Sequence, residues 1–224
     1  MAISDSLQAV KTRIAAACVA AGRPPNAVQL LVVSKTFPGS AVREAFAAGA
    51  RAFGENYVQE GLAKVEELAD LRGDIAWHLI GPLQSNKTKP IAEQFDWVHS
   101  VDRLKIAQRL SEQRPAGLPP LNICLQVNIS AEDSKSGLLP DEVAALAKQV
   151  AALPRLTLRG LMAIPEPGPG ALAQHQAMAA LFNALNAQGL ALDTLSLGMS
   201  ADLKDAIRAG STMVRIGSAI FGQR

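Results

Sequence analysis

The sequence has few of the features that mark secreted, metal-binding or membrane proteins. Its two cysteines, Cys18 and Cys124, stand far apart without a CxxC spacing, which argues against a disulfide framework and a zinc site. No apolar run approaches the roughly 18 residues that a membrane span needs. Residues 1–5 lack the basic start of a secretion signal. We therefore expect a cytoplasmic protein with no membrane partner.

Charge of either sign is also scarce. Charged residues make up 19% of the 224 residues, and the formal net charge is only +2. No basic run is interleaved with aromatic residues, so the sequence predicts no nucleic-acid partner. The hydrophobic fraction of 49% excludes disorder and is sufficient for a large core.

The sequence does have a regular alternation of short aliphatic runs with longer amphipathic, alanine-rich runs. Strand patterns occupy residues 30–34, 52–54, 75–80, 97–99, 121–127, 156–162, 194–197 and 213–216. Helical patterns occupy residues 4–20, 41–48, 87–95, 102–113, 140–152, 171–188 and 201–209, and one more ends near residue 71. We expect Ser4, Pro140 and Ser200 to begin three of these helices.

Eight strand and helix units predict an α/β fold, a single (β/α)8 TIM barrel over residues 1–224 with an extra N-terminal helix. The alternative is a doubly wound sheet, which usually has fewer strands and a glycine-rich turn after its first strand. Residues 34–39 read Ser-Lys-Thr-Phe-Pro-Gly and lack the G-x-G-x-x-G pattern of that turn. No linker interrupts the alternation of strand and helix patterns, so we expect one domain.

Lys35 ends the most apolar strand pattern. Active sites of (β/α)8 barrels lie at the C-terminal ends of the strands. Partial desolvation there favours the neutral amine, which attacks aldehydes and forms a Schiff base. The alternative is a lysine whose ammonium group simply reaches solvent at a strand end. Position alone leaves both interpretations open.

The loops after the seventh and eighth strand patterns have the composition of a phosphate site. They read Gly198-Met199-Ser200 and Gly217-Ser218, and phosphate often lies between these two loops in such barrels. Glycines let backbone N–H groups approach an anion, and serine hydroxyls add donors. Ordinary turn and cap chemistry is the alternative, but the occurrence of both loops at the expected strands favours phosphate.

Arg215 lies within the eighth strand pattern, where a buried guanidinium group needs a partner. That partner could be an acid inside the barrel or a ligand near its mouth. A lysine facing a phosphate site fits two kinds of ligand. One is a phosphorylated sugar, as in a lysine-dependent aldolase, and the other is pyridoxal 5'-phosphate (PLP), whose aldehyde binds a lysine.

Seven segments resemble those of the pyridoxal phosphate homeostasis protein family, single-domain relatives of the alanine racemase barrel. They are Val33–Thr36, Gly54–Glu60, Trp77–Lys87, Ser134–Gly137, Gly160–Met162, Leu197–Ser200 and Arg215–Gly217. The long segment that ends at Lys87 is the most specific of them. The resemblance implies a fold-type III PLP-binding barrel that takes part in intracellular PLP homeostasis, buffering PLP or delivering it to PLP-dependent apoenzymes.

The resemblance also implies a role for individual residues. Lys35 would hold PLP as a Schiff base, Asn56 would line the ring site, and Arg215 would face the pyridine nitrogen. The remaining residues would bind the phosphate, namely Ser200, Gly217, Ser218 and the nearby backbone of Met199.

Three functions remain open at this point: a PLP carrier, a weak PLP-dependent amino-acid racemase or lyase, and a PLP-free aldolase. Racemisation needs an acid or base on each face of the ring, and Lys35 can serve only one face. The racemases that this barrel resembles take the second from a tyrosine of a further C-terminal domain, whereas the only tyrosine here, Tyr57, matches no such role. We therefore favour the carrier and expect a monomer.

Other polar residues are weaker candidates. His78 and His99 end strand patterns, where a histidine can touch a ligand or form structural hydrogen bonds. Lys135 could meet a ligand at the mouth, but a surface ion pair with its acidic neighbours is the plainer interpretation. Lys87 and Lys89 are expected on a solvated helix face. No metal-ligand spacing occurs.

Overall fold

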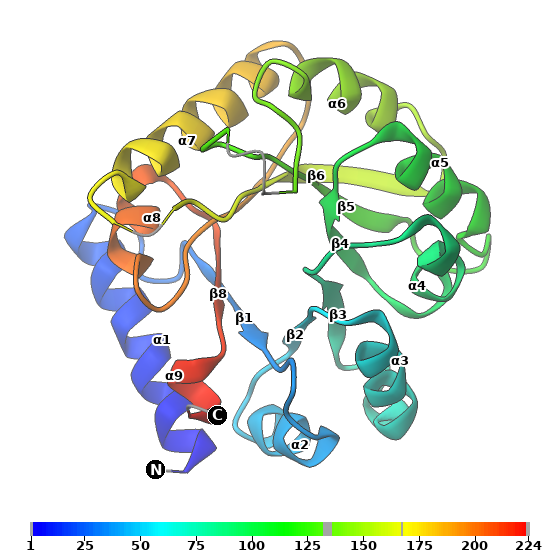
Figure 1. The fold of residues 1–224 in the computed structure, drawn as a ribbon. Coiled ribbons are helices and arrows are strands. Elements are labelled where there is room, and N and C mark those ends of the chain that lie inside the picture. The colour runs from blue at the N-terminus through cyan, green and yellow to red at the C-terminus, as the bar shows by residue number, and fades with distance from the viewer. Residues whose placement is uncertain (1, 132–135, 167, 223–224) are drawn as a thin grey trace.

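Eight parallel strands close into one barrel in the computed structural model, which describes residues 2–131, 136–166 and 168–222. The strands are β1 (Gln29–Val33), β2 (Ala52–Glu55), β3 (Ala76–Leu79), β4 (Trp97–Val101), β5 (Leu121–Gln126), β6 (Leu156–Met162), β7 (Thr194–Ser196) and β8 (Met213–Ile216). Each strand pairs with its neighbour in sequence, and β8 pairs with β1 to close the cylinder (Figure 1). The predicted barrel is confirmed.

Helices form the outer layer of the barrel (Figure 1). They are α1 (Ile3–Ala20), α2 (Gly39–Ala47), α3 (Val58–Glu67), α4 (Thr88–Gln94), α5 (Leu104–Gln113), α6 (Val143–Ala151), α7 (Ala171–Ala187), α8 (Leu203–Ala209) and α9 (Ser218–Phe221), with short 3-10 helices at Ala69–Leu71 and Ser85–Lys87. The predicted N-terminal helix α1 packs against α2, α8 and α9. It therefore covers the outside of the seam where β1 meets β8.

The main core lies between the strands and the surrounding helices. Because successive strand residues point to opposite faces, every second strand residue instead faces the barrel interior. Two small apolar clusters lie there, one around Leu31 and Met213 and the other around Trp97 and Met162. The aliphatic runs recognised in the sequence are thus buried on both faces, as a parallel barrel requires.

Two helices begin at residues other than the predicted ones. The Ala2 carbonyl accepts the Ser6 N–H at 3.1 Å, so α1 begins at Ile3 with Ala2 as N-cap, and Ser4 is not its cap. The predicted start at Pro140 is also wrong, because residues 139–142 form a turn in which the Glu142 carboxylate accepts the Leu139 N–H at 2.8 Å. Helix α6 therefore begins three residues later, at Val143.

The third predicted start, at Ser200, is wrong for a similar reason. Helix α8 begins at Leu203, and its N-cap position is occupied by Asp202. The Asp202 carboxylate accepts the Met199 N–H at 2.6 Å, which holds residues 199–202 in a turn ahead of the helix. Strand β4 also runs further than predicted, so that His99 lies inside it rather than at its end.

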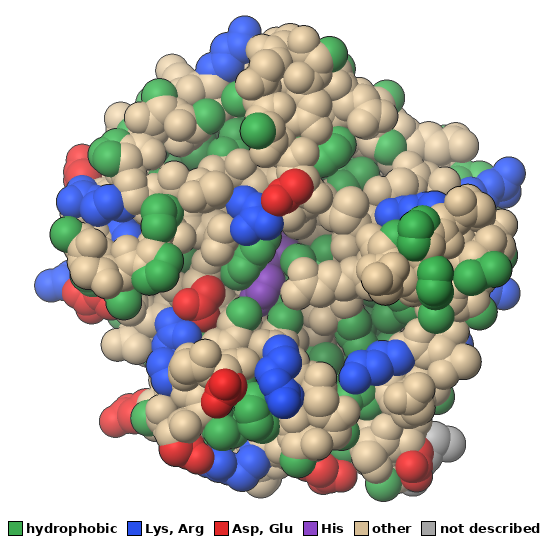
Figure 2. All heavy atoms as spheres, turned by 180° about the vertical axis from the view of Figure 1, so that it is seen from behind, with side chains coloured by type: hydrophobic (Ala, Val, Ile, Leu, Met, Phe, Trp, Pro, Cys, Tyr) green, Lys and Arg blue, Asp and Glu red, His purple; other side chains and the backbone are tan. Residues whose placement is uncertain are grey.

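The surface shows no concentration of one chemical type on the face opposite the view of Figure 1. Side chains of both charge signs are interspersed there, with histidine visible at the centre (Figure 2). Among the described residues, no helix is both long and apolar enough to cross a bilayer. The same part of the chain holds no cluster of three or more histidine, cysteine, aspartate or glutamate residues suited to a metal ion.

Candidate ligand site at the barrel mouth

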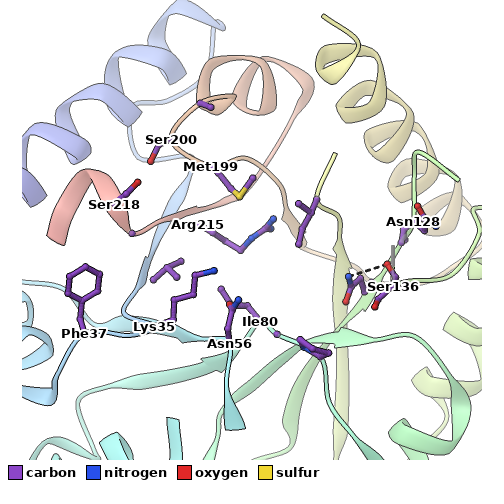
Figure 3. A pocket seen from close by; sticks show the side chains of 18 of the residues that line it. Lys35, Phe37, Asn56, Ile80, Asn128, Ser136, Met199, Ser200, Arg215 and Ser218 are labelled. Carbon is purple, nitrogen blue, oxygen red and sulfur yellow. Dashed lines mark hydrogen bonds between the residues drawn. The ribbon is translucent and has the colours of Figure 1, made fainter. Parts of the chain in front are cut away.

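A cavity of about 810 Å³ opens beside the C-terminal ends of the strands. All seven residues that the sequence analysis assigned to a ligand line this cavity, as Figure 3 shows for most of them: Lys35, Asn56, Met199, Ser200, Arg215, Gly217 and Ser218. Closing the barrel brings β1 beside β8, and this closure unites residues from opposite ends of the sequence. Their common location is a finding, whereas their individual roles remain predictions.

Lys35 follows β1 directly, and its side chain points into the cavity (Figure 3). It lies in a tight turn in which the Phe37 N–H donates to the Ser34 carbonyl at 3.1 Å. Asn56 follows β2 and lies beside Lys35 in the same view. A Cβ on Gly81 would overlap the Asn56 carbonyl oxygen, so glycine at position 81 lets the next loop pack tightly against Asn56.

Two loops of small residues form the opposite rim. Gly198 has a φ of 95°, a conformation that favours glycine, and a Cβ there would lie 2.5 Å from the Cβ of Ala206. A Cβ on Gly217 would lie 2.8 Å from the Val33 carbonyl oxygen. Within the described part of the chain, the hydroxyls of Ser200 and Ser218 make no hydrogen bond, so both are available to a ligand.

The backbone of Met199, which is predicted to lie near the phosphate, already has a hydrogen-bond partner. Its side chain lines the cavity, but its N–H donates to Asp202, whose second oxygen lies 2.9 Å from His175 Nε2. Burial alone would raise the pKa of Asp202, but the hydrogen bonds from His175 and Met199 hold it below its ordinary value. The Met199 N–H is therefore occupied by a carboxylate in this structure.

Arg215 is buried and projects from β8 into the cavity (Figure 3). Its Nη1 donates to the carbonyl and hydroxyl oxygens of Ser196 at 2.7 and 2.8 Å, and its Nη2 donates to the Ala163 carbonyl at 2.9 Å. Burial lowers the pKa of Arg215 to about 10, so the group stays charged at neutral pH. None of its hydrogen-bond acceptors within the described residues is a carboxylate, which leaves its charge suited to a ligand.

A chain of buried polar groups continues from Arg215 across the barrel interior. Ser196 Oγ lies 3.1 Å from His99 Nδ1, and His99 Nε2 lies 2.9 Å from His78 Nδ1. The His78 ring stacks on Trp97 with their centroids 5.0 Å apart. Burial lowers the pKa of His78 to about 3 and lowers that of His99 as well. Neither histidine lines the cavity, so both are structural hydrogen-bonding groups.

The remaining sequence candidates lie elsewhere. Tyr57 is 56% exposed and does not line the cavity. The Lys89 side chain is 70% exposed and lies 3.9 Å from Glu93, as expected of a solvated helix face, whereas Lys87 is half-buried. Lys135 lies outside the described residues.

The fold and the site define a class of protein, because the chain matches the family described as "Alanine racemase, N-terminal domain" over residues 6–224 and belongs to it. The alanine racemase of Corynebacterium glutamicum shares the barrel fold, with a TM-score of 0.69 and 19% identity. That match covers 98% of this chain and 61% of the racemase chain.

Within that class, the chain belongs to the pyridoxal phosphate homeostasis protein family. It is 64% identical to the Pseudomonas aeruginosa protein of that name, over 99% of this chain and 96% of the relative. The Escherichia coli K12 protein is 54% identical over 99% and 97% of the two chains. The structure of PipY from Synechococcus elongatus with PLP bound has a TM-score of 0.85 and 38% identity, and covers 98% and 100%. The family resemblance noted from the motifs is confirmed.

Proposed function

We propose that this protein binds PLP at the barrel mouth and buffers or delivers it in the cytoplasm. The names of its relatives and the PLP bound to PipY support this function. One observation carries the proposal for this chain. The same cavity is lined by a lysine side chain, two serine hydroxyls and a buried guanidinium group that has no carboxylate partner among the described residues.

The cavity fits PLP in size and in chemistry. Its volume of about 810 Å³ lies within the range of roughly 300–1,000 Å³ that is usual for small-molecule sites. When bound, PLP supplies an aldehyde that condenses reversibly with a primary amine and releases water. Lys35 supplies that amine, and Asn56 lines the space beside it. The loops at Ser200 and Ser218, with the Gly217 backbone, supply donors for a phosphate.

In this proposal, Arg215 would donate a hydrogen bond to the pyridine nitrogen of bound PLP. A guanidinium group cannot accept a proton, and its charge disfavours a second positive charge beside it. The ring nitrogen would therefore stay largely unprotonated, which weakens PLP as an electron sink. This arrangement suits storage of the cofactor better than demanding carbanion chemistry.

The ionisable groups of the cavity favour binding over racemisation. Among the described residues that line it, only Lys35 and Arg215 carry ionisable side chains, and arginine is a poor proton acceptor. A two-base mechanism would need a second acid or base on the other face of the ring. The described residues offer one candidate base, so we propose a carrier rather than an enzyme.

Delivery follows from the reversibility of the linkage at Lys35. The amine of a lysine in a PLP-dependent apoenzyme would displace the Lys35 amine, exchanging one C=N bond for another, and the free Lys35 amine would be regenerated. Mixing PLP-loaded protein with such an apoenzyme should restore its activity at lower free PLP than PLP alone requires. Equal recovery with free PLP would argue against delivery. We expect the carrier to be a monomer, and light scattering measures its oligomeric state.

Lys35→Ala tests the binding proposal. The wild-type protein should turn yellow with added PLP, and borohydride should fix PLP to the peptide that contains Lys35. The variant should stay folded by circular dichroism and retain only PLP held without a covalent bond. Lys89→Ala, at an exposed lysine, is the control and should behave as wild type. A wild type that takes up no PLP, or fixation that survives in Lys35→Ala, would contradict the proposal.

A further inference from the structure

A cluster of three buried or half-buried charges lies directly behind Lys35, on the side away from the cavity. It consists of Glu55 at the end of β2 and of Glu60 and Lys64 on α3. Lys64 Nζ lies 2.8 Å from Glu55 Oε1 and 2.7 Å from Glu60 Oε1. The Glu55 side chain is 0% exposed and that of Lys64 is 5% exposed. None of the three lines the cavity, and the proposed function does not use them.

The cluster contacts the two residues that flank Lys35. Lys64 Nζ donates to the Ser34 carbonyl at 2.7 Å, and the Ser34 hydroxyl donates to Glu55 Oε1 at 2.5 Å. On the other side, the Thr36 N–H donates to Glu60 Oε1. Three hydrogen bonds from one charged cluster thus end on the residues immediately before and after Lys35.

The turn around Lys35 needs such support. Thr36 has a φ of 65°, a left-handed conformation that β-branched residues rarely adopt. It occupies the third position of the turn that the Ser34–Phe37 hydrogen bond closes, where glycine is preferred when φ is positive. The Ser34 carbonyl accepts from both Phe37 N–H and Lys64 Nζ. The cluster therefore holds both ends of a conformation that Thr36 would not favour by itself.

Lys64 is also directed away from the cavity by its hydrogen bonds. Its Nζ donates to Ser34, Glu55 and Glu60, so all three donors of an ammonium group have acceptors. Although Lys64 lies close to the Lys35 turn, it does not line the cavity.

We propose that Lys64, held by Glu55 and Glu60, is a positioning residue that fixes the Lys35 turn so that the Lys35 amine points into the cavity. The same hydrogen bonds keep Lys64 from competing with Lys35 for an aldehyde. This inference rests on the proposed function, because it concerns the amine that is proposed to bind PLP. It adds residues that the cavity alone does not reveal.

Glu60→Ala tests the inference with little risk to folding, because the Glu60 side chain is 26% exposed. It removes the acceptor for both Thr36 and Lys64, and we expect covalent capture of added PLP at Lys35 to slow roughly tenfold, a modest cost for a misplaced reacting group. Glu60→Gln should restore the wild-type rate, since both bonds end on a single oxygen that an amide can supply. Glu66→Ala, at an exposed position of the same helix, is the matched control.

Capture is measured by stopping the reaction with borohydride and quantifying the labelled Lys35 peptide. Hydrogen exchange of the Thr36 amide without PLP gives an independent readout, and it should be faster in Glu60→Ala alone. A purely structural role would lower the melting temperature but leave both measurements unchanged, and this result would overturn the inference. A wild type that captures no PLP would instead refute the proposed function, while faster Thr36 exchange in Glu60→Ala would still support the cluster's hold on the turn.

Discussion

Two buried polar groups of residues flank the Lys35–Arg215 cavity, and they tolerate burial in different ways. Inside the barrel, the chain from Arg215 through Ser196 to His99 and His78 carries a single charge, because both imidazoles are held neutral. Outside β2, the cluster around Lys64 instead places opposite charges in direct contact. The first arrangement confines charge to one guanidinium group, whereas the second pairs groups of opposite charge.

The comparison indicates how the stability of the protein should change when a side chain of each group is replaced. Removing a neutral member of the hydrogen-bond chain breaks one or two bonds and creates no new unpaired charge. A charge cluster that loses its ammonium group leaves a buried carboxylate without a cation, in a medium that solvates it poorly. The cluster behind Lys35 should therefore be the more sensitive of the two, and it lies next to the lysine that is proposed to bind PLP.

Lys64→Met should give the largest effect. It leaves Glu55 buried without its cation, and breaking a buried pair in this way costs about 3–5 kcal/mol. Urea unfolding followed by circular dichroism measures the loss. Adding Glu55→Met to the same chain should recover most of it, because no charge is then left buried. A single variant within about 1 kcal/mol of wild type would show that the cluster is better solvated than its burial indicates.

Acid should destabilise the protein through the interior chain. The pKa of His78 is about 3 in the folded protein and about 6.5 in an unfolded chain. The unfolded state therefore binds more protons below about pH 6.5, and stability falls as the pH is lowered through that window, by up to about 1.4 kcal/mol per pH unit for each histidine.

His78→Phe isolates this contribution, because a phenyl ring preserves the stacking on Trp97 without a titratable group. The free energy of unfolding should depend less steeply on pH in the variant between about pH 5 and 6.5. Titration of Glu55 cannot explain such a difference, because Glu55 is present in both proteins. Identical slopes would show that His78 binds protons equally in the folded and unfolded states, which would contradict the lowered pKa.

Ser196→Ala should have a smaller effect than the loss of Lys64. It removes the hydroxyl between Arg215 Nη1 and His99 Nδ1, and leaving buried partners unsatisfied costs about 1–3 kcal/mol. Arg215 keeps its bonds to the two carbonyls, so the fold should survive. Weaker PLP binding measured by equilibrium dialysis would show that the hydroxyl also orients the guanidinium group. A loss as large as that of Lys64→Met would contradict the distinction between the two groups.

Ser200→Ala should change stability least, by about 0.5 kcal/mol or less, as is usual for surface substitutions away from a cap. The reason is that Asp202, and not Ser200, occupies the N-cap position of α8. PLP affinity should nevertheless fall, because the variant lacks one proposed phosphate donor. Unchanged affinity would show that Ser200 does not bind the phosphate. A large loss of stability would show that Ser200 has a structural role.

The barrel and six of the seven predicted site residues could be inferred from local signals, whereas Asn56 was implied only by the family resemblance. Aliphatic runs mark strands, and barrel topology places whatever follows a strand at the mouth. The starts of α6 and α8 could not be predicted in the same way, since the carboxylates of Glu142 and Asp202 bind nearby N–H groups in turns that compete with helix formation.

The two buried groups were harder to foresee because their partners are distant in sequence. His99 meets a serine 97 positions away, and Lys64 meets the Ser34 carbonyl 30 positions away. One signal was present: Glu55 directly follows the short strand pattern at residues 52–54, and a charged residue that is buried needs a partner. The sequence does not say that this partner is Lys64, because helix α3 must first dock against β2.

Helix α1 has a consequence for how the barrel comes apart. The barrel is closed by the pairing of its first strand, β1, with its last strand, β8. Helix α1 lies outside this pairing and packs against α8 and α9, the helices that follow the two serine loops. Loss of this helix would expose that strand pairing together with the loops that are proposed to bind the phosphate of PLP. Bound PLP should therefore be lost early in thermal unfolding, before the strands on the opposite side of the barrel separate.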